Sequence, residues 1–362
     1  MKILHVGEYV NGGVATYLKT LINGLRQYKD IDNHLVMSKY KSEQDWGDMQ
    51  DKVTYYEYKR NIWNIFKAMV FIYKFINKIQ PDIIHVHSTW AGVFVRFPLL
   101  FMRKKAKIIY QPHGWAFLMD TSNWKKQIYI LIEKVLSIPT DKIINISNYE
   151  QNKAIEYGFD KNKMVMIYNG VEDRKNTGSM KITMDKNKIN LLFVGRLDRQ
   201  KGLDIFLQTY EKYDFPNIHL YVIGVSVLNN TVPKNTDKTT YLGWVDNKDI
   251  DAYYQACDAV IMPSRWEGFG LVAVEAMRNS KSVIVSNVGA LPELVQSNIN
   301  GYVFDLKEKI SLKDILFKLD KNKLKIIGNS NRKVYLKFFR DKIFVKNIYN
   351  VYRIVGMRNN DK

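Results

Sequence analysis

Two glutamates, Glu267 and Glu275, stand eight positions apart in the segment PSRWEGFGLVAVEAM (residues 263–277). Glu267 lies between a tryptophan and a glycine-rich turn, where a loop is expected, whereas Glu275 falls inside an apolar run with helical spacing. An unpaired carboxylate inside an apolar helix is costly. Glu275 therefore either reaches solvent or is bound by a partner, and this pair is the first candidate for chemistry.

A second charged segment, GRLDRQKG (Gly195–Gly202), follows an apolar run that is predicted to be a strand. Arg196 and Lys201 would lie just beyond the carboxyl end of that strand. There a guanidinium in a fixed position and a flexible ammonium group could hold a diphosphate from two sides. The alternative interpretation is an exposed basic turn without a ligand.

Two glycines, Gly12 and Gly13, stand at the corresponding place near the start of the chain, in NGGVATYL. They follow a predicted strand and open a predicted helix, so their backbone N–H groups could approach a phosphate at the positive end of that helix. A tight turn alone would also need glycine, and the dinucleotide pattern G-x-G-x-x-G is absent.

Histidines also stand at predicted strand ends: His113 in QPHGW, and His85 and His87 in HVHS. Three such residues could suggest a metal site, but no cysteine or carboxylate cluster completes one. Asp-x-Asp pairs occur at 30–32 and 249–251, where a surface loop or a helix start is expected. We therefore predict no metal site and no cofactor.

The composition suits a folded protein of two domains, with 362 residues and 46% hydrophobic residues. The one cysteine, Cys257, excludes a disulfide framework, fits a reducing compartment and is expected to be a buried thiol. The N-terminus lacks the features of a signal peptide, and no apolar run is long enough to span a membrane.

The net charge of +19 is unevenly distributed: +8 over residues 1–172, zero over 173–305 and +11 over 306–362. A basic face is one interpretation, with nucleic acid, an anionic membrane or phosphorylated substrates as partners. A generally lysine-rich composition is the other. The stretch 59–80 combines five basic residues with five aromatic ones and has no acidic residue. It is either an interfacial membrane helix or a crossover helix that buries its aromatic rings on a sheet.

Short apolar runs alternate with amphipathic segments, which is typical of parallel α/β sheets. The first series of predicted strands is KILHVG, DIIHVHS, KIIYQPHG, DKIINIS and KMVMIYNG. The second is INLLFVG, IHLYVIG, DAVIMPS, SVIVSN and GYVFDL. The polar stretch 173–188 separates the two series. We predict Rossmann-like domains over 1–172 and 189–340, a linker over 173–188, and terminal basic helices between 330 and 358.

Together these segments resemble the retaining GT-B glycosyltransferases of glycosyltransferase family 4. The matching elements occur in the family's order and cover most of the chain: NGGVATYL, PHG, YNGV, GRLDRQKG, PSRWEGFGLVAVEAM, SNVGALPELV and NGYVFD. The first loop, YVNGG, departs from the usual Gly-Pro-Gly-Gly. GVSV (224–227) replaces the usual Gly-(Asp/Glu)-Gly, which places the contacts to the base in question. The resemblance implies two Rossmann-like domains facing across a cleft, with a C-terminal helix, about 341–362, folding back on the first domain.

The resemblance also implies roles for individual residues. Glu275 would accept hydrogen bonds from the ribose hydroxyls of a nucleotide-sugar, and Glu267 would lie beside the transferred sugar. Arg196 and Lys201 match the pair that binds the diphosphate. The expected catalytic residues are His113, Glu267, Arg196 and Lys201. The expected donor-binding residues are Gly12, Gly13, Arg196, Lys201, Gly243, Trp244, Glu267, Gly268, Phe269, Gly270, Leu271 and Glu275.

The activity implied by this resemblance is metal-independent transfer of a hexose or N-acetylhexosamine, with retention, from a nucleoside-diphosphate sugar, most often of uridine. The expected acceptor is a polyprenyl-diphosphate-linked or other saccharide, in capsule or O-antigen synthesis, at the inner face of the cell membrane. The alternatives are a GT-B-fold sugar-nucleotide epimerase and a non-catalytic partner of a glycosyltransferase. Nucleic acid is not an expected partner, since only the charge suggests it.

Overall fold

The computed structural model describes residues 1–102, 105–174, 178–226, 232–307 and 309–357. These residues form two compact units. The first contains Met1–Gly170 together with the C-terminal segment from Asp341, and the second contains Val171–Arg340. Parts of two predicted segments, residues 175–177 of the linker and 358–362 of the last helix, lie outside the described residues.

The first unit is built on a seven-stranded sheet in the order β3-β2-β1-β4-β5-β6-β7, in which every pair is parallel. Its strands are β1 (Lys2–Gly7), β2 (Asp32–Ser38), β3 (Val53–Tyr56), β4 (Ile83–His87), β5 (Lys107–Gln111), β6 (Lys142–Asn145) and β7 (Met164–Met166). Its helices are α1 (Gly13–Leu25), α2 (Ile62–Ile79), α3 (Thr89–Arg96), α4 (Asn123–Leu136), α5 (Asn148–Glu156) and α12 (Asp341–Met357).

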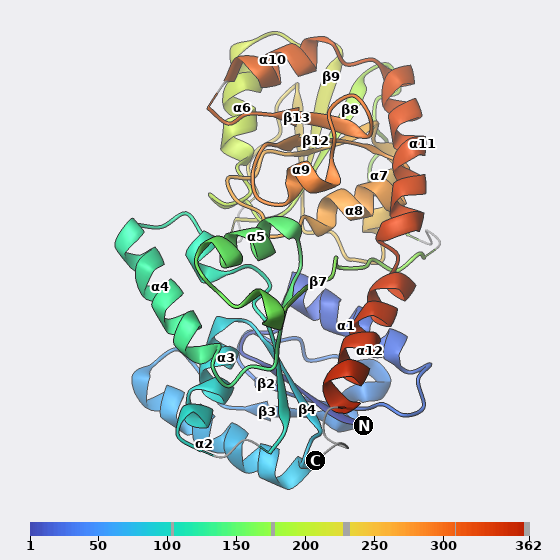
Figure 1. Ribbon diagram of the computed structural model, residues 1–362. Helices are drawn as coiled ribbons and strands as arrows, with labels where there is room; N and C mark the ends of the chain where they lie inside the picture. The colour runs from blue at the N-terminus through green and yellow to red at the C-terminus, as the bar shows by residue number, and fades with distance from the viewer. Residues whose placement is uncertain (103–104, 175–177, 227–231, 308, 358–362) are drawn as a thin grey trace. The chain divides into compact units, whose positions relative to one another are not determined.

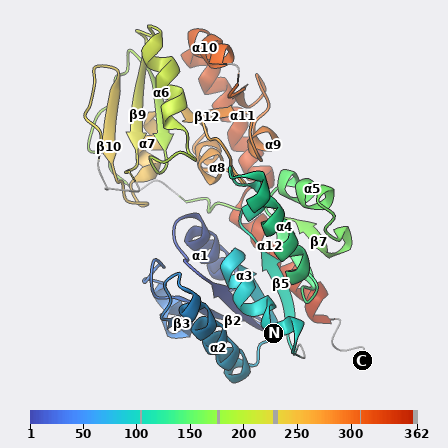
Figure 2. The same cartoon turned by 90° about the vertical axis from the view of Figure 1, so that its left-hand side faces the viewer.

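Alternate side chains of the central strands enter two separate cores, because successive residues of a strand point to opposite faces. Ile3 and Ile83 face a core shared with α1 and α12, whereas Leu4 and Ile84 face a core shared with α2, α3 and α4. Figure 2 shows α3 between α2 and α4 on this second face.

The C-terminal helix α12 packs against α1 within the first unit, as predicted (Figure 1). Gly24 of α1 leaves no room for a Cβ, since that atom would overlap the side chain of Val345. Tyr28 and Tyr349 stack with their ring centroids 3.7 Å apart. The buried Tyr352 carries its hydroxyl to His85 of β4, 2.7 Å from Nδ1. The last helix therefore completes the first unit's core, although it follows the second unit in sequence.

The second unit has a six-stranded parallel sheet in the order β10-β9-β8-β11-β12-β13. Its strands are β8 (Ile189–Val194), β9 (Ile218–Ile223), β10 (Thr239–Gly243), β11 (Ala259–Met262), β12 (Ser282–Ser286) and β13 (Gly301–Phe304). Its helices are α6 (Leu203–Lys212), α7 (Ile250–Ala256), α8 (Leu271–Arg278), α9 (Leu291–Leu294), α10 (Lys309–Phe317) and α11 (Lys321–Phe338).

The predicted class, two parallel-sheet α/β domains with a returning terminal helix, is confirmed. Every strand predicted from an apolar run is present. The strands β2, β3 and β10 were not predicted, because they are short or carry polar residues such as Asn33, Thr239 and Thr240. In both sheets the glycine and histidine turns chosen from the sequence lie at the carboxyl ends of strands, where parallel α/β proteins bind their ligands.

Candidate active site

Two of the expected catalytic residues in the second unit, Lys201 and Glu267, form an ion pair. Lys201 donates a hydrogen bond of 2.7 Å from Nζ to Oε2 of Glu267, and both side chains are mostly buried. Ser264 lies 3.4 Å from the same oxygen. Arg196 is more exposed and contacts Asp198 and Gln200. The two predicted cations are therefore neutralised within the protein, and a bound anion would compete with Glu267 and Asp198 for them.

Hydrogen bonds fasten the loop after β8 to the loop after β11. The backbone N–H of Arg265 donates to the carbonyl of Gln200 at 2.8 Å, and the Gln200 amide donates to the carbonyl of Trp266 at 3.3 Å. The Arg265 guanidinium donates two hydrogen bonds to the carboxylate of Asp204, the second residue of α6, at 2.8 and 2.6 Å. Gly202 closes the contact, since a Cβ there would overlap the carbonyl oxygen of Pro263. The loop after β8 and the loop after β11 are thus held together by these contacts.

The backbone of Glu267 is held from the other side by the turn after β12. Ala290 donates its N–H to the Glu267 carbonyl at 3.2 Å. Gly289 has φ +56°, and a Cβ there would overlap the same carbonyl oxygen. Only glycine combines this close approach with the left-handed backbone at low cost. The position of Glu267 is therefore set by three loops.

Helix α8 begins immediately beyond this loop. Gly270 precedes it with φ +104°, and no side chain caps the helix. Gly268, Phe269, Gly270 and Leu271 supply the backbone of the turn, and Phe269 is buried. An uncapped helix N-terminus presents N–H groups and the positive end of the helix dipole, which favours an anion.

Glu275 lies on the second turn of α8 and is partly buried. Tyr254 of α7 donates its hydroxyl to Oε2 at 2.8 Å. Burial raises the pKa of the Glu275 carboxyl above the usual glutamate value, with Arg278 and Tyr254 acting in the opposite direction. Glu275 therefore has a partner inside the protein, because the buried Tyr254 binds one of its two carboxylate oxygens.

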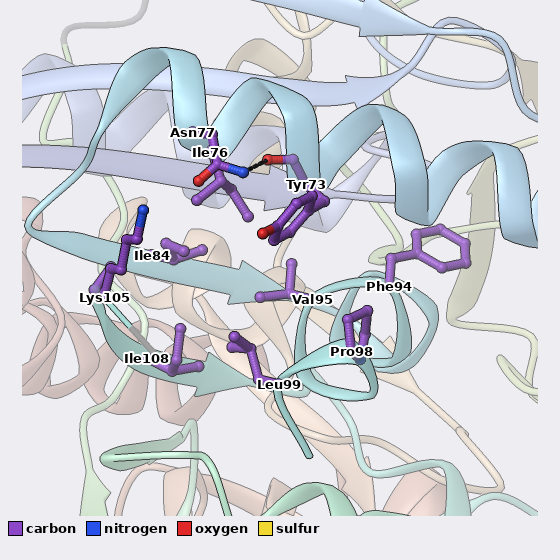
Figure 3. Close-up of a pocket in the computed structure, with 11 residues that line it drawn as sticks. Tyr73, Ile76, Asn77, Ile84, Phe94, Val95, Pro98, Leu99, Lys105 and Ile108 are labelled. Atoms are coloured by element: carbon purple, nitrogen blue, oxygen red, sulfur yellow. Dashed lines mark hydrogen bonds between the residues drawn. The ribbon is translucent and has the colours of Figure 1, made fainter. Parts of the chain in front are cut away.

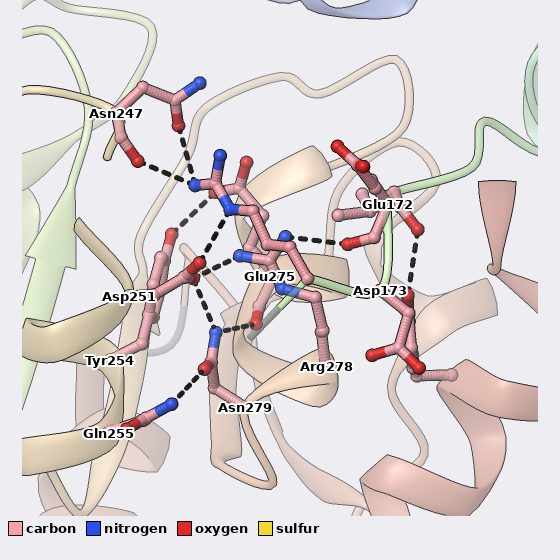
Figure 4. Close-up of polar contacts among 12 residues, drawn as sticks. Glu172, Asp173, Asn247, Asp251, Tyr254, Gln255, Glu275, Arg278 and Asn279 are labelled. Carbon is pink, nitrogen blue, oxygen red and sulfur yellow. Dashed lines mark hydrogen bonds and ion pairs between the residues drawn. The ribbon is translucent and has the colours of Figure 1, made fainter. Parts of the chain in front are cut away.

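A buried network adjoins Glu275 at the C-terminal end of α8 (Figure 4). Arg278 pairs with Asp251 and donates to the carbonyl of Glu172. Arg174 donates to Asp251 at 2.8 Å, and Asn279 donates to it at 2.9 Å. Of the two expected positions, a surface loop or a helix start, the second is observed, because Asp249 precedes α7 and Asp251 lies in its first turn. Asp251 is buried, and two arginines and an amide compensate its charge.

The turn that contains the expected donor-binding residues Gly243 and Trp244 lies at the carboxyl edge of the same sheet. Gly243 ends β10 with φ +68°, and its carbonyl accepts the N–H of Gly224 at 2.8 Å. A Cβ on Gly224 would overlap the carbonyl oxygen of Gly195, so the ends of β8 and β9 approach closely. Trp244 follows with 72% of its surface exposed. A flat exposed ring beside glycine turns can stack on a nucleobase.

The first unit carries the remaining site candidates at the carboxyl ends of β1 and β5. Gly12 has φ +54°, precedes α1 and faces open space, and its N–H donates to its neighbour Asn11 at 2.6 Å. Gly13 is the first residue of α1 and is exposed. His113 has φ +54°, and its Nε2 lies 3.0 Å from Nδ1 of His87. Burial lowers the pKa of His113 to about 3, so its ring is neutral at physiological pH.

The histidines do not group as the sequence suggested. His5, His85 and His87, all fully buried, have ring nitrogens within 4.8 Å of one another. His113 contacts His87 only at the edge of this group. His5 was missed because a single histidine in the strand KILHVG gave no signal. No carboxylate joins the three rings in the part of the chain that the structure describes.

Two cavities lie away from these residues. One, of about 50 Å³, is an apolar hollow between α2, α3 and the following turn, lined by Tyr73, Ile84, Val95, Leu99 and Ile108 among others (Figure 3). The other, of about 420 Å³, is polar and is lined by Arg174, Arg278 and Arg332 with their partners. Neither of these two cavities is lined by a predicted site residue.

Comparison with known proteins identifies the family. The description "Glycosyltransferase Family 4" matches residues 11–175, and "Glycosyl transferases group 1" matches residues 175–334. An uncharacterized 41.2 kDa protein in the cps region of Klebsiella pneumoniae is 37% identical over 327 residues, covering 87% of this chain and 89% of that protein. The chain belongs to the family 4 glycosyltransferases.

Other relatives of this glycosyltransferase agree. The UDP-Gal:alpha-D-GlcNAc-diphosphoundecaprenol alpha-1,3-galactosyltransferase of Escherichia coli is 27% identical over 285 residues, 73% of each chain. Sucrose-phosphate synthase from Thermosynechococcus elongatus superimposes with a TM-score of 0.84 at 18% identity, over 99% of this chain and 100% of that one. The fold is GT-B.

Within this glycosyltransferase the second unit brings together Arg196, Lys201, Glu267 and the start of α8, with Glu275 farther along the same helix. Sequence reasoning missed the residues that fix them: Gln200, Arg265, Gly289 and Tyr254. Gln200, Arg265 and Gly289 lie inside motifs identified in the sequence, but the spacing alone does not reveal which loops they join.

We expect Gly289→Ala to lower the turnover of sugar transfer by about 100-fold, because its Cβ must displace the Glu267 backbone and a shift of that kind misaligns reacting groups. Gly47→Ala is the matched control: Gly47 has nearly the same φ, +55°, and open space around it. Steady-state kinetics compare the two. Equal effects would show that backbone strain alone, rather than the contact with Glu267, matters.

We expect Glu275→Gln to raise the melting temperature at neutral pH. The folded-state pKa of Glu275 is raised, so its contribution to stability is present at low pH and is lost as the pH rises through that pKa. A neutral amide avoids this loss and keeps the Tyr254 contact. The advantage should disappear below about pH 3, where the wild-type carboxyl is protonated in both the folded and the unfolded state. Melting temperatures measured over a range of pH test this prediction, with Glu211→Gln, at an exposed glutamate of α6, as the control. A lower melting temperature of Glu275→Gln at pH 7 would contradict the raised pKa of Glu275.

Proposed function

We propose that this protein transfers a hexose or N-acetylhexosamine, with retention, from a nucleoside-diphosphate sugar to a lipid-linked saccharide in bacterial surface polysaccharide synthesis. The observation that carries the proposal is the Lys201–Glu267 pair beside the uncapped start of α8. Relatives support the direction: one is encoded in a cps region, and another is named for UDP-galactose and a diphosphoundecaprenol acceptor. We infer a uridine donor from the latter.

The donor diphosphate would take the place of Glu267 as the partner of Lys201. Arg196, Lys201 and the N-terminal turn of α8 would then surround its oxygens with positive charge. This exchange would release the Glu267 carboxylate, 2.7 Å from Nζ in the unbound protein, to accept hydrogen bonds from the sugar hydroxyls. Donor binding and the positioning of Glu267 would thus be one event.

The ribose would bind at Glu275. Its Oε2 accepts the Tyr254 hydroxyl, and the carboxylate can accept further hydrogen bonds from the two ribose hydroxyls. Trp244 would provide a stacking surface for the base. Together these contacts place the nucleoside on one side of the diphosphate and the sugar, beside Glu267, on the other.

Retention would follow from attack on the same face that the diphosphate leaves. The bond between the anomeric carbon and the phosphate oxygen breaks, the acceptor oxygen bonds to that carbon, and its proton passes to a phosphate oxygen. Glu267 is paired with a lysine, which suits a positioning carboxylate rather than the carboxylate pair of a retaining glycosidase. In this scheme the fixed cations stabilise the leaving charge, and a metal ion is not required.

A thermal-shift panel of nucleotides and nucleotide-sugars, without added metal, tests the donor site. We expect one nucleoside diphosphate to stabilise the protein, by about 2.7 kcal/mol at a concentration of a hundred times Kd. Glu275→Gln should abolish this shift. Lys201→Ala should lower turnover by about 100-fold or more, the usual result of removing one electrostatic donor.

Lys212→Ala, an exposed lysine at the end of α6, is the matched control and should behave as the wild type. A flat panel would overturn the donor site. Conversion of the donor sugar without any acceptor would instead favour an epimerase, and stabilisation by duplex DNA alone would overturn the function altogether.

The acceptor end of the proposal rests on the α2–α4 face of the first unit. More than half of the exposed large hydrophobic side chains in the described part of the chain fall between residues 62 and 138. They include Ile62, Trp63, Phe66, Val70, Phe71 and Tyr73 on α2, and Trp124, Ile128, Leu131, Ile132 and Val135 on α4. Trp63, Phe66, Phe71 and Tyr73 are exposed, whereas Phe75 is partly buried and packs against the core. The interpretation of a helix that buries its aromatic rings on the sheet therefore fits only Phe75.

The charge of this face is positive. Lys67, Lys74 and Lys78 are exposed on α2, and Lys125 and Lys134 on α4. The one acidic residue of α4, Glu133, is buried and paired with Arg96 at 2.7 Å. Exposed aromatic rings with surrounding lysines match the surface of an anionic bilayer. Both helices follow strands whose carboxyl ends form the ligand edge, so a lipid-linked acceptor could reach that edge. Among the described residues no helix has the length and apolarity to cross a membrane.

We expect the protein to float with vesicles containing phosphatidylglycerol at low salt and to bind neutral vesicles or high-salt samples more weakly. Trp63→Ser with Trp124→Ser should weaken binding at least about tenfold, because each change removes a large apolar side chain from the face. Ile326→Ser, equally exposed but on α11, is the control and should bind normally. No flotation at low salt would remove the membrane contact from the proposal.

A further inference from the structure

A row of three imidazole rings ends at His113. Nε2 of His113 lies 3.0 Å from Nδ1 of His87, and Nε2 of His87 lies 3.1 Å from Nδ1 of His5. Nε2 of His5 in turn lies 3.2 Å from Oδ1 of Asn33. These residues come from β1, β2, the end of β4 and the turn after β5, which the parallel register places side by side.

The hydrogen bonds along this row have one direction. A neutral imidazole has one N–H and one bare nitrogen, so a ring that donates at Nε2 must accept at Nδ1. The Asn33 oxygen accepts, hence His5 donates to it and accepts from His87 Nε2. His87 then accepts from His113 Nε2. A single amide oxygen at the buried end therefore specifies which nitrogen of His113 carries the proton.

The surroundings keep the row neutral. His5 and His87 are fully buried, and burial lowers the pKa of His5 to about 4 and that of His87 well below its usual value. Tyr17, Gln111 and Tyr352, which contact the rings, are uncharged. The buried carboxylate of Glu150 lies beside the residue after His113, 3.9 Å from the position that a Cβ on Gly114 would take. Tyr17 of α1 donates to Gln111 of β5 at 2.6 Å, the Tyr352 hydroxyl of α12 contacts His85, and His85 itself is neutral through burial. Asn33 is not a base, so a proton that enters at His113 has no group to receive it. The row can orient a proton but cannot relay one.

The outer ring is held as well as oriented. His113 has φ +54°, a left-handed backbone conformation that is uncommon for a residue other than glycine, and Gly114 follows it with φ +110°. The Tyr17 ring meets the His113 ring edge to face at 4.6 Å between centroids. Unlike His5 and His87, His113 is partly exposed, so its remaining nitrogen, Nδ1, is the atom left for a ligand.

We propose that Asn33, His5 and His87 are positioning residues that hold His113 in the Nε2–H tautomer, so that its Nδ1 is left to accept a hydrogen bond from a hydroxyl of a saccharide bound to the first unit. The tautomer itself depends only on the row, whereas the contact with a sugar hydroxyl rests on the proposed function. His113 then acts as a fixed acceptor and not as an acid.

NMR spectroscopy of the wild-type protein with ¹⁵N-labelled histidine tests the tautomer without any substrate. The chain has six histidines, so assignment by single His→Gln variants is practical. Long-range ¹H–¹⁵N spectra distinguish the two neutral tautomers from imidazolium. We expect His5, His87 and His113 to remain Nε2–H from about pH 6 to about pH 8, the range in which a free histidine titrates. An Nδ1–H or charged His113 would overturn the proposal.

A transition metal co-purifying in stoichiometric amount would also overturn it, because the metal would occupy lone pairs that the row uses. Elemental analysis of the same sample decides this. The wild-type spectra keep the proposal falsifiable even if variants of buried residues fail to fold.

Two variants of Asn33 separate positioning from mere packing. Asn33→Leu removes the acceptor oxygen, so His113 should populate both tautomers. We expect kcat to fall by about tenfold, which corresponds to the loss of one hydrogen bond. Asn33→Asp retains an acceptor oxygen, so turnover near pH 8 should be rescued. Its added charge favours a protonated row, so the acid limb of the kcat profile should move to higher pH.

A purely structural Asn33 would change the melting temperature in both variants, with no change in tautomer or pH profile, and that result would overturn the positioning role. If no sugar transfer is found at all, the proposed function fails, while the spectra still report on the row.

Discussion

Parallel pairing of every strand is the constraint on which the molecule depends. A parallel sheet brings the carboxyl ends of all its strands to one edge, and each chain must leave that edge through a turn into a helix. The turns at Gly12, His113, Gly195 and Glu267 are positioned by this rule before any specific contact acts. Motifs far apart in sequence therefore become neighbours within each unit. Because both sheets are parallel, each unit has one edge at which its strand-end turns collect.

Charges near those edges are compensated within the protein. Lys201 is paired with Glu267, Arg265 with Asp204, and Arg278 and Arg174 share Asp251. Unpaired charges in such positions would be costly, so the unbound protein keeps its binding groups occupied with one another. A ligand that carries its own charges can exchange these partners without leaving a charge unpaired. The Lys201–Glu267 pair is thus both a structural contact and the point at which a donor would enter.

Three features of the molecule are unfavourable for stability by themselves. Glu275 is a carboxyl group whose burial raises its pKa, His113 has a left-handed backbone, and the α2–α4 face exposes apolar rings to water. Local conflicts of this kind concentrate at functional sites, where the surrounding structure compensates for them. The three lie on elements that the proposal assigns to the ribose, the sugar and the membrane.

Apolar runs and their spacing were sufficient to predict both parallel sheets and the long helices, because burial of alternate faces leaves few other folds for such a pattern. The return of the last helix to the first unit was expected only from the family resemblance. Residue types at strand ends were sufficient to select Arg196, Lys201 and Glu267, and a carboxylate inside an apolar helical run was sufficient to select Glu275. The polar strand β2 was not predictable in the same way, since Asn33 and His34 hide its buried face.

Only the tertiary structure decided the partners. The pairing of Lys201 with Glu267, the burial of Asp251, the contact of Gly289 with the Glu267 carbonyl and the row from Asn33 to His113 each join residues from separate strands or loops. Spacing along the chain carries information about a residue's own helix or strand, but contacts between elements depend on sheet register and loop geometry. For the same reason the sequence indicated which side chains could do chemistry, and the folded chain determined which atoms they present.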